Sequence, residues 1–525
     1  MKYTIRRRWF LQMVMAIMAP KKVTRRKMRK KLKKLDCALV YILLFAVVAF
    51  VDSAFGEAAR LATPVLGYQL DISRCKVPKM EALYRIVDVL AALGYNQFQL
   101  YTEHTFAYKN HETVWCEASP MTPDEVRALD DYCAARGIEL VPNQNSFGHL
   151  EQWLRHPEYN GLANHPQGGA RIARWDDMIM GMPSALNPCD DASLEFVAGL
   201  YDELLPCFRS RYFNVGCDEA VDIEDADGRG CSAQAVREKG AARIYLDFLK
   251  KIYGEVKKRE HVMMFWCDNI LLSHSELLPE IPDDVICLNW GYEETHSFED
   301  QTTRLEAAGR KFIVCPGTSA WGSLSGRVDN MLGNIDNAIA AGTRHGAMGY
   351  LLADWGDCGN PQPWIVSLPA LVYLSHRAKG ETLSREQLAK EIDKICGCRC
   401  GEALLAYGGI YLKCGGRTGS HTELFRALTD GARYERDSGV TEDSLELAFA
   451  EGRRAKALLD LDGAPDWVTD DFALLDLLYR AVEVKMKYPR KANFRAMFEP
   501  EYRRLWLRQN RLGGLKDSLV WVFGL

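Results

Sequence analysis

Two adjacent carboxylates, Asp218 and Glu219, are the residues of this sequence best placed to do chemistry. They follow a short apolar run at residues 212–216, which is typical of a buried strand. Repulsion between two carboxylates held this close leaves one ionised and the other able to hold a proton near neutral pH. One member of the pair can therefore act as a general acid while the other stays charged. Adjacent strand residues point to opposite faces, so the two side chains share a site only where the chain leaves strand geometry. Taken alone, the pair is explained equally well as part of a solvated loop.

Polar and aromatic residues end several other apolar runs of the sequence. A pyranose ring has an apolar face that stacks on aromatic rings and a hydroxyl rim that needs polar partners. Carboxylates and tryptophans at the same strand level therefore predict a sugar-binding site, although a single tryptophan or histidine is more often a core residue. The residues concerned are Glu103, His149, Trp266, Trp290 and Trp355.

The elements that would position these residues are eight short apolar runs, which alternate with helix-length amphipathic stretches. This alternation is typical of a parallel sheet with crossover helices. One helix is marked by a capping box at Thr122 and Glu125, with Pro123 at its first position. Eight such units close into a (β/α)8 barrel, whose active site lies at the carboxyl ends of its strands. The predicted strands are residues 67–72, 95–101, 138–143, 212–216, 262–267, 285–290, 311–315 and 348–355.

The 525 residues suit a barrel with an appendage. After the last predicted strand, periodic stretches rich in Leu, Ala, Glu and Arg indicate helices. We therefore predict three parts: a basic N-terminus with an export signal at residues 1–56, a catalytic (β/α)8 barrel at 57–370, and an α-helical C-terminal domain at 371–525.

The N-terminal part has the form of an export signal, because a basic run at residues 21–35 precedes an apolar run at 37–51 and small residues. The apolar run is shorter than the roughly 18–20 residues of a spanning helix. We therefore expect a cleaved signal and a periplasmic or secreted protein. An uncleaved membrane anchor is one alternative, and a cytoplasmic protein is the other if the segment is not a signal. Met28 would be a more typical first residue for a protein with such a signal. We therefore expect that the residues before Met28 make the given sequence too long at its N-terminus.

Composition excludes several other classes of protein. With 48% hydrophobic and 26% charged residues the chain is typical of soluble globular proteins. A net charge of -4 gives no reason to expect a nucleic acid as partner. The 16 cysteines are dispersed, often inside apolar runs, which favours buried thiols. The cluster of Cys396, Cys398, Cys400 and Cys414 lacks the usual spacing of zinc ligands, so we expect no metal and no cofactor.

The strand ends resemble the catalytic barrel of glycoside hydrolase family 20, the β-N-acetylhexosaminidases, whose fourth strand ends in Gly-Gly-Asp-Glu or Gly-Cys-Asp-Glu, as residues 216–219 do here. The resemblance covers about residues 66 to 370 and is greater to the hexosaminidase D branch. It implies a hydrolase that removes terminal β-linked N-acetylhexosamine from a glycan or glycoconjugate. The stretches that carry it are GYQLDISR, YTEHTFAY, IELVPNQNSFGHLEQWLRHPEY and MMFWCDNIL.

The resemblance also implies a mechanism, in which the 2-acetamido group of the sugar attacks the anomeric carbon and forms an oxazolinium intermediate. Glu219 would protonate the leaving oxygen, and Asp218 would hold the acetamido N–H. Tyr292 is our candidate for the acetamido carbonyl. The resemblance also implies a relay from Glu103 and His149 that tunes the proton on Glu219. Asp357 would bind the distal hydroxyls of the sugar, and the mechanism uses no metal. The aromatic wall of the sugar site would consist of Trp266, Trp290 and Trp355.

The sequence departs from the family at two places. Many members have an arginine for the sugar's 3- and 4-hydroxyls just before the first strand, where this chain has Leu66. The seventh strand ends in residues 315–321, without the Tyr-Leu-Asp of the family. These departures leave the preference between N-acetylglucosamine and N-acetylgalactosamine open.

Three other classes of barrel compete with this interpretation. A retaining glycosidase with a carboxylate nucleophile needs a second carboxylate about 5 Å away, commonly after strand seven, and that strand offers none. A metal-dependent hydrolase needs more histidines at the strand ends than this chain has. A non-catalytic or specificity-drifted carbohydrate-binding barrel stays the main alternative, because fold and motif do not prove turnover.

Overall fold

The structure is a computed structural model of the chain, and it describes residues 64–172, 178–431, 434–488 and 493–524. The predicted basic N-terminus and export signal lie outside the described residues. Within those ranges, none of the helices combines the length and the apolar character needed to cross a membrane.

Eight parallel strands form the barrel that the sequence predicted, in the order β3-β2-β1-β10-β9-β8-β7-β6. The two outer strands of this sheet meet at a bridge between Asn143 and Asn214, where the N–H of Gln144 donates to the carbonyl of Asn214 at 3.0 Å. This contact nearly closes the barrel. The strands are β1 (Val65–Asp71), β2 (Gln97–Tyr101), β3 (Glu139–Val141), β6 (Tyr212–Asn214), β7 (Val262–Trp266), β8 (Ile286–Trp290), β9 (Lys311–Cys315) and β10 (Gly349–Asp354).

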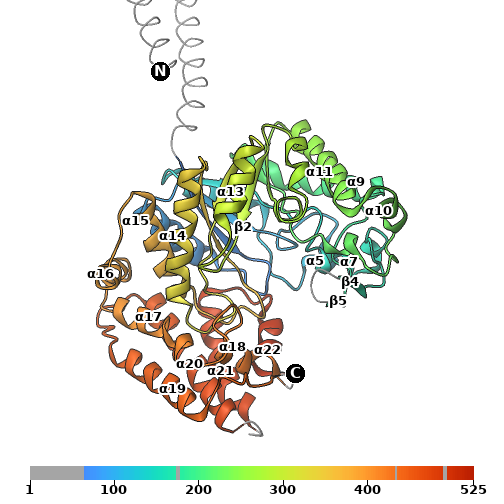
Figure 1. Cartoon of the computed structure of the whole chain (residues 1–525). Helices are drawn as coiled ribbons and strands as arrows, with labels where there is room; N and C mark the ends of the chain where they lie inside the picture. The colour runs from blue at the N-terminus through green and yellow to red at the C-terminus, as the bar shows by residue number, and fades with distance from the viewer. Residues whose placement is uncertain (1–63, 173–177, 432–433, 489–492, 525) are drawn as a thin grey trace, which may run out of the picture. The chain divides into compact units, whose positions relative to one another are not determined.

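Helices connect the strands, as predicted (Figure 1). The capping box of α6 is present, because Glu125 N donates to Thr122 Oγ1 at 3.3 Å and Thr122 N donates to Glu125 Oε2 at 2.9 Å. An antiparallel hairpin of β4 (Ala170–Ile172) and β5 (Met178–Met180) lies outside the barrel sheet and was not predicted. The helices up to the last strand are α4 (Met80–Leu93), α5 (Glu112–Trp115), α6 (Pro123–Ala134), α7 (Glu151–Leu154), α8 (Pro157–Asn160), α9 (Asp191–Leu204), α10 (Ala233–Lys239), α11 (Ala241–Lys258), α12 (Asp268–Leu271), α13 (Phe298–Ala307) and α14 (Val328–Arg344).

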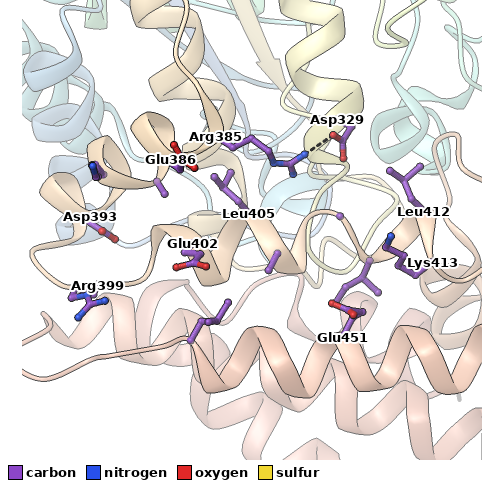
Figure 2. A pocket seen from close by; sticks show the side chains of 16 residues that line it. Asp329, Arg385, Glu386, Asp393, Arg399, Glu402, Leu405, Leu412, Lys413 and Glu451 are labelled. Carbon is purple, nitrogen blue, oxygen red and sulfur yellow. Dashed lines mark hydrogen bonds and ion pairs between the residues drawn. The ribbon is translucent and has the colours of Figure 1, made fainter.

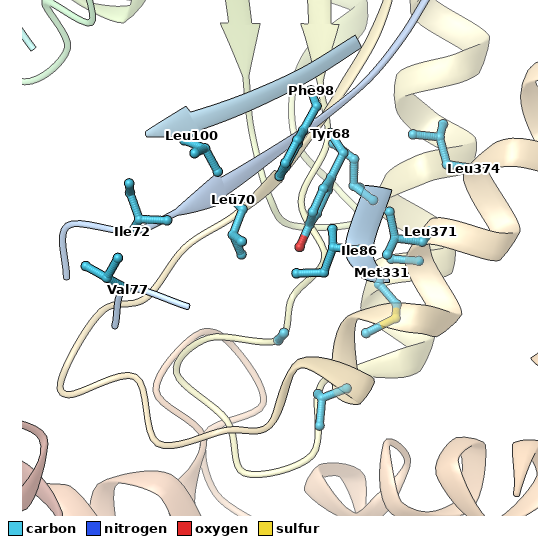
Figure 3. Close-up of a cluster of buried hydrophobic side chains, with 14 of the residues drawn as sticks. Tyr68, Leu70, Ile72, Val77, Ile86, Phe98, Leu100, Met331, Leu371 and Leu374 are labelled. Carbon is cyan, nitrogen blue, oxygen red and sulfur yellow. The ribbon is translucent and has the colours of Figure 1, made fainter. Parts of the chain in front are cut away.

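The core around β1 and β2 shows how strand alternation sorts the side chains (Figure 3). Tyr68 and Leu70 of β1 belong to the cluster that packs on the surrounding helices, and the ring of Tyr68 stacks on Phe98 with 5.8 Å between centroids. Tyr101, at the end of β2, belongs instead to the cluster of Trp266 and the other residues inside the barrel. Because side chains alternate along a strand, the inward residues at the strand ends converge on the barrel mouth.

In the described part of the chain after β10, all the regular elements are helices, in agreement with the predicted helical region. Helices α17 to α22 pack on one another (Figure 1). The barrel and this helical region belong to one compact unit, Val65–Leu525. The domain boundary proposed at residue 370 stays a prediction. The helices are α15 (Leu368–Ala378), α16 (Arg385–Cys396), α17 (Gly401–Tyr407), α18 (Glu423–Thr429), α19 (Glu442–Ala457), α20 (Asp466–Lys487), α21 (Phe494–Gln509) and α22 (Leu515–Phe523).

Candidate active site

The turn after β6 brings Asp218 and Glu219 together. The strand ends at Asn214, and the backbone then takes positive φ angles at Gly216 (67°), Cys217 (70°) and Glu219 (44°). Non-glycine residues seldom adopt such angles, and where they do the surrounding structure must hold them. The chain thus leaves regular strand geometry at this point, which is the condition for two adjacent carboxylates to share one site.

Close packing holds this turn in place. A Cβ atom on Gly216 would lie 1.7 Å from Asn145 Oδ1, and one on Gly148 would lie 2.5 Å from the carbonyl oxygen of Asp218. The hydroxyl of Tyr245 donates to the carbonyl of Cys217 at 2.7 Å. The segments after β3 and β6 therefore approach each other so closely that only glycine fits at the two contact points.

His149 lies between the two carboxylates. Its Nε2 is 3.4 Å from Asp218 Oδ2 and 3.4 Å from Glu219 Oε2. Burial lowers the pKa of His149, but Asp218 and Glu219 outweigh this effect and raise it well above the ordinary value of histidine. The predicted histidine is thus in contact with both members of the pair.

The two carboxylates have different surroundings. Asp218 is 6% exposed, and its buried Oδ1 has no hydrogen-bond partner among the described residues. The side chain of Glu219 is 33% exposed. Asp218 therefore presents an unused acceptor inside the site, since a buried carboxylate oxygen normally has a donor, whereas Glu219 lies at the border with solvent.

Arg74, on the loop after β1, joins several predicted site residues and was missed from the sequence. Its guanidinium lies 3.1 Å from Asp71, 3.5 Å from Glu103 and 3.5 Å from Asp357. Its Nη2 lies 3.3 Å from His149 Nδ1. Arg74 therefore lies between Glu103 and His149, and the relay between these two residues stays a prediction.

Glu103 is a buried member of this network, with 5% of its surface exposed. The hydroxyl of Tyr101 donates to Glu103 Oε1 at 3.0 Å. Burial raises the pKa of Glu103 to about 7, although Arg74 and His149 act in the opposite direction. Glu103 therefore changes its charge close to neutral pH.

Aromatic rings line the barrel mouth. The rings of Trp266 and Trp355 are 5.9 Å apart, and Trp355 meets the edge of Tyr101 at 4.7 Å. The guanidinium of Arg74 lies 5.0 Å from the centre of the Trp355 ring. Trp266 is completely buried, and its indole Nε1 lacks an acceptor in the described part of the chain. The predicted tryptophans therefore converge, with Trp266 deepest.

Tyr292 lies over the end of β9, although it belongs to the loop after β8. Its ring stacks on Trp290 at 5.2 Å and meets the edge of Trp321 at 5.0 Å. A Cβ on Gly317 would lie 2.7 Å from the Tyr292 ring, so the glycine after β9 leaves room for it. Tyr292 thus fills the part of the mouth where the predicted seventh strand lacks a tyrosine of its own. Trp321 is a fourth tryptophan of the site that was not predicted.

Asp268 is a third carboxyl group beside the pair, and the sequence reasoning missed it. It is 6% exposed, its Oδ2 accepts the N–H of Glu219 at 3.4 Å, and its Oδ1 accepts the indole N–H of Trp290 at 3.3 Å. Burial, followed by the charges of Asp218 and Glu219, raises its pKa to about 8. Asp268 follows the strand that ends at Trp266. A carboxylate just after a predicted strand is the same pattern by which Asp218 was recognised, so the sequence did contain a signal for Asp268.

Asp357 lies on the loop after β10, where Arg74 Nε is 3.5 Å away, and burial raises its pKa. Leu66 lies at the opposite end of the barrel, near the start of β1, in the outer cluster with Tyr68. Arg74 thus places a guanidinium on the loop that follows β1, whereas Leu66 lies near the start of the same strand.

A separate cavity of about 740 Å³ lies among the C-terminal helices (Figure 2). Its lining carries charges of both signs, with Arg385 and Asp329 paired at 2.6 Å, and includes no aromatic side chain. It therefore lacks the ring on which a sugar stacks. In the ranges that the structure describes, no group of three or more His, Cys, Asp or Glu side chains could hold a metal ion.

Comparison with known proteins agrees with this geometry. Residues 66–321 match the description "Glycosyl hydrolase family 20, catalytic domain". The chain is 24% identical to hexosaminidase D of Bos taurus and 21% identical to that of Homo sapiens, in each case over 210 residues and 39% of this chain. These matches cover 54% of the bovine and 38% of the human protein, so the chain spans about half or less of these relatives.

Among solved structures, the exo β-N-acetylglucosaminidase of Vibrio harveyi in complex with N-acetylglucosamine has a TM-score of 0.50 and 15% identity, covering 64% of this chain and 59% of that one. This likeness shows the fold. The barrel, its strand-end carboxylates and its tryptophans are the features expected of a glycoside hydrolase. Within that class, residues 66–321 are similar to the catalytic domain of glycosyl hydrolase family 20, a match that covers just under half of the chain.

Proposed function

We propose that this protein removes terminal β-linked N-acetylhexosamine from a glycan or glycoconjugate, with retention and by substrate assistance. The observation that carries the proposal is the buried, unpartnered Oδ1 of Asp218 beside Glu219. A sugar with a 2-acetamido group supplies the N–H donor that this oxygen lacks.

The proposed roles follow from the surroundings of each residue. Asp218 accepts the acetamido N–H and stabilises the positive oxazolinium that forms when the acetamido oxygen attacks the anomeric carbon. Glu219, one third exposed, donates its proton to the leaving oxygen at the open side of the site. Tyr292 donates its hydroxyl hydrogen to the acetamido carbonyl. Trp355 gives the ring a stacking face.

His149 and Arg74 are positioning residues in this scheme. His149 contacts both carboxylates through Nε2, and Arg74 contacts Nδ1 of the same ring. The ring therefore keeps Asp218 and Glu219 apart at a fixed spacing and favours a proton on Nε2 between them. The distal hydroxyls would bind at Arg74 and Asp357, which lie 3.5 Å apart.

The experiment measures release of p-nitrophenol from its β-N-acetylglucosaminide and β-N-acetylgalactosaminide. Glu219→Gln and Asp218→Asn should each lower kcat by about 10²–10⁴-fold, because each removes one role in the transition state. Glu386→Gln, an exposed carboxylate of α16, is the control and should act like wild type.

A thiazoline analogue of the oxazolinium should inhibit the wild type strongly. Indifference to it would favour a double-displacement enzyme, and sugar binding without turnover would favour the carbohydrate-binding barrel.

We propose, separately, that the protein is exported and that residues 1–56 carry its signal. What supports this is the basic run followed by a short apolar run in the sequence. Cell fractionation with N-terminal sequencing of the mature protein tests it. A shortened protein in the exported fraction is the expected result. A full-length chain in the membrane would indicate an anchor, and one in the cytoplasm would exclude a signal.

A further inference from the structure

A groove of about 680 Å³ lies beside the candidate active site and is finished by the C-terminal helix α22. Its barrel side includes Arg74, Glu103 and Asp357, the same residues that border the catalytic pair through His149. Its other side includes Lys516 and Trp521 of α22. The groove therefore adjoins the site at Arg74, and neither Asp218 nor Glu219 lines it.

His104 is a polar residue in the lining of the groove. It is 7% exposed, and its Nδ1 has no partner among the residues that the structure describes. Burial, followed by the charges of Arg155 and His156, lowers the pKa of His104 to about 3, so the ring is neutral at physiological pH. A neutral imidazole both donates and accepts, which suits a hydroxyl group.

Trp521 gives the groove a stacking face. It is 41% exposed, although a large aromatic ring is normally covered. The charged residues that line the groove are of both signs, Arg74, Arg155 and Lys516 against Glu103, Glu117, Asp357 and Asp517. An aromatic ring among balanced polar groups suits an uncharged, hydroxyl-rich ring better than a strongly charged substituent.

Close packing fixes Trp521 against the barrel. A Cβ on Gly359, after β10, would lie 2.6 Å from Cβ of Trp521, and one on Gly514, just before α22, would lie 1.7 Å from the carbonyl oxygen of Cys75. The hydroxyl of Ser518 donates to the carbonyl of Gly359. The groove is therefore pre-formed, which lowers the cost of binding a ligand there.

We infer that this groove is a subsite for a second sugar, attached to the distal side of the N-acetylhexosamine whose glycosidic bond is cut. The inference rests on the proposed function, because the direction follows from the leaving group at Glu219 and the distal hydroxyls at Arg74 and Asp357. It implies that the protein releases an intact disaccharide from a suitable glycoside, as well as a single N-acetylhexosamine.

The test uses p-nitrophenyl disaccharides that carry a second sugar on the 3-, 4- or 6-hydroxyl of the reacting N-acetylhexosamine, with the monosaccharide glycoside beside them. At least one disaccharide should release p-nitrophenol together with the intact disaccharide in one step. Trp521→Ala should lower the ratio of kcat/KM for that disaccharide to kcat/KM for the monosaccharide about tenfold, from the loss of ring stacking.

Two variants control for folding of α22. Trp521→Phe keeps an aromatic face and should restore most of the ratio, and Val520→Ala changes an exposed neighbour that does not line the groove. The subsite is refuted if no disaccharide is released intact, or if Trp521→Ala lowers both activities equally while its circular dichroism is native. Hydrolysis of the monosaccharide alone would refute only the subsite, whereas no hydrolysis of any substrate would refute the proposed function.

Discussion

Backbone strain gathers at individual residues around the barrel mouth. Besides Cys217 and Glu219, positive φ angles occur at Cys75, His149 and Cys358, each in the segment that follows a barrel strand. Each such conformation costs on the order of 1–3 kcal/mol and persists only where its surroundings enforce it. The carboxyl ends of the strands are therefore strained where side chains must be aimed into the site.

The buried carboxyl group of Asp268 should make stability fall as pH rises. Its pKa is raised to about 8 in the folded protein, so the folded state keeps a proton that the unfolded state loses near pH 4. Its contribution to the free energy of unfolding is therefore complete below pH 4 and is lost as pH rises toward 8. Asp268→Asn should reduce the loss between pH 5 and 8 by on the order of 1–3 kcal/mol.

Urea denaturation at pH 5 and pH 8 measures this difference. Asp124→Asn is the control, since its side chain is 95% exposed, and it should keep the wild-type pH dependence. An unchanged dependence in Asp268→Asn would show that this group is not protonated in the folded protein.

The site could be predicted in part from the rule that strand-end residues face the barrel mouth. The rule located Asp218, Glu219 and His149, which the structure brings into contact. It missed Arg74, because this residue lies beyond the strand and is turned back by Asp71, whose Oδ1 accepts the N–H of Arg74 at 3.1 Å. Such a local turn depends on side-chain contacts that no apolar pattern records.

At the level of elements, the turn after β6 depends on Gly216. Alanine there would meet Asn145 and would also have to adopt a φ of 67°. Gly216→Ala should therefore destabilise the protein by more than about 2 kcal/mol and lower kcat, because the turn that aims Asp218 and Glu219 must shift.

Thermal unfolding and the p-nitrophenol assay check this together. Gly199→Ala is the matched control, since Gly199 lies in helix α9 with open space around its Cα, and alanine there should be neutral or stabilising. Native stability and native kcat in Gly216→Ala would contradict the rigid turn.

The strands were predicted better than their ends. All eight are present, but most are shorter than predicted, as in β3, which covers Glu139–Val141 instead of residues 138–143. An apolar run continues to be buried after the strand pairing stops, so hydrophobicity overstates the length of a strand. The hairpin of β4 and β5 was missed because its strands are too short to show alternation.

At the scale of the molecule, the barrel and the helical region should unfold together, since Val65–Leu525 is one compact unit. Arg511 joins them, with its guanidinium 2.9 Å from the carbonyl of Pro120 and 2.9 Å from Glu125. Calorimetry should show one transition. Arg511→Ala should destabilise the whole unit by about 1.5–3 kcal/mol, the range for hydrogen bonds to charged groups.

Arg508→Ala is the control, because Arg508 lies three residues earlier, at the end of α21, with a side chain that is 52% exposed. Its effect should stay within about 0.5 kcal/mol. Two separate transitions, of which Arg511→Ala moves only one, would contradict a single cooperative unit.

The pairing of β1 with β10 has a consequence for synthesis of the chain on the ribosome. Val65 pairs with Gly349, and the groove beside the site is completed only by α22. At about 5–20 residues per second, β1 waits on the order of tens of seconds for this partner. During that interval β1 can pair with β2 on one side, but its other edge stays free. A chaperone therefore has its greatest effect before the last third of the chain is made.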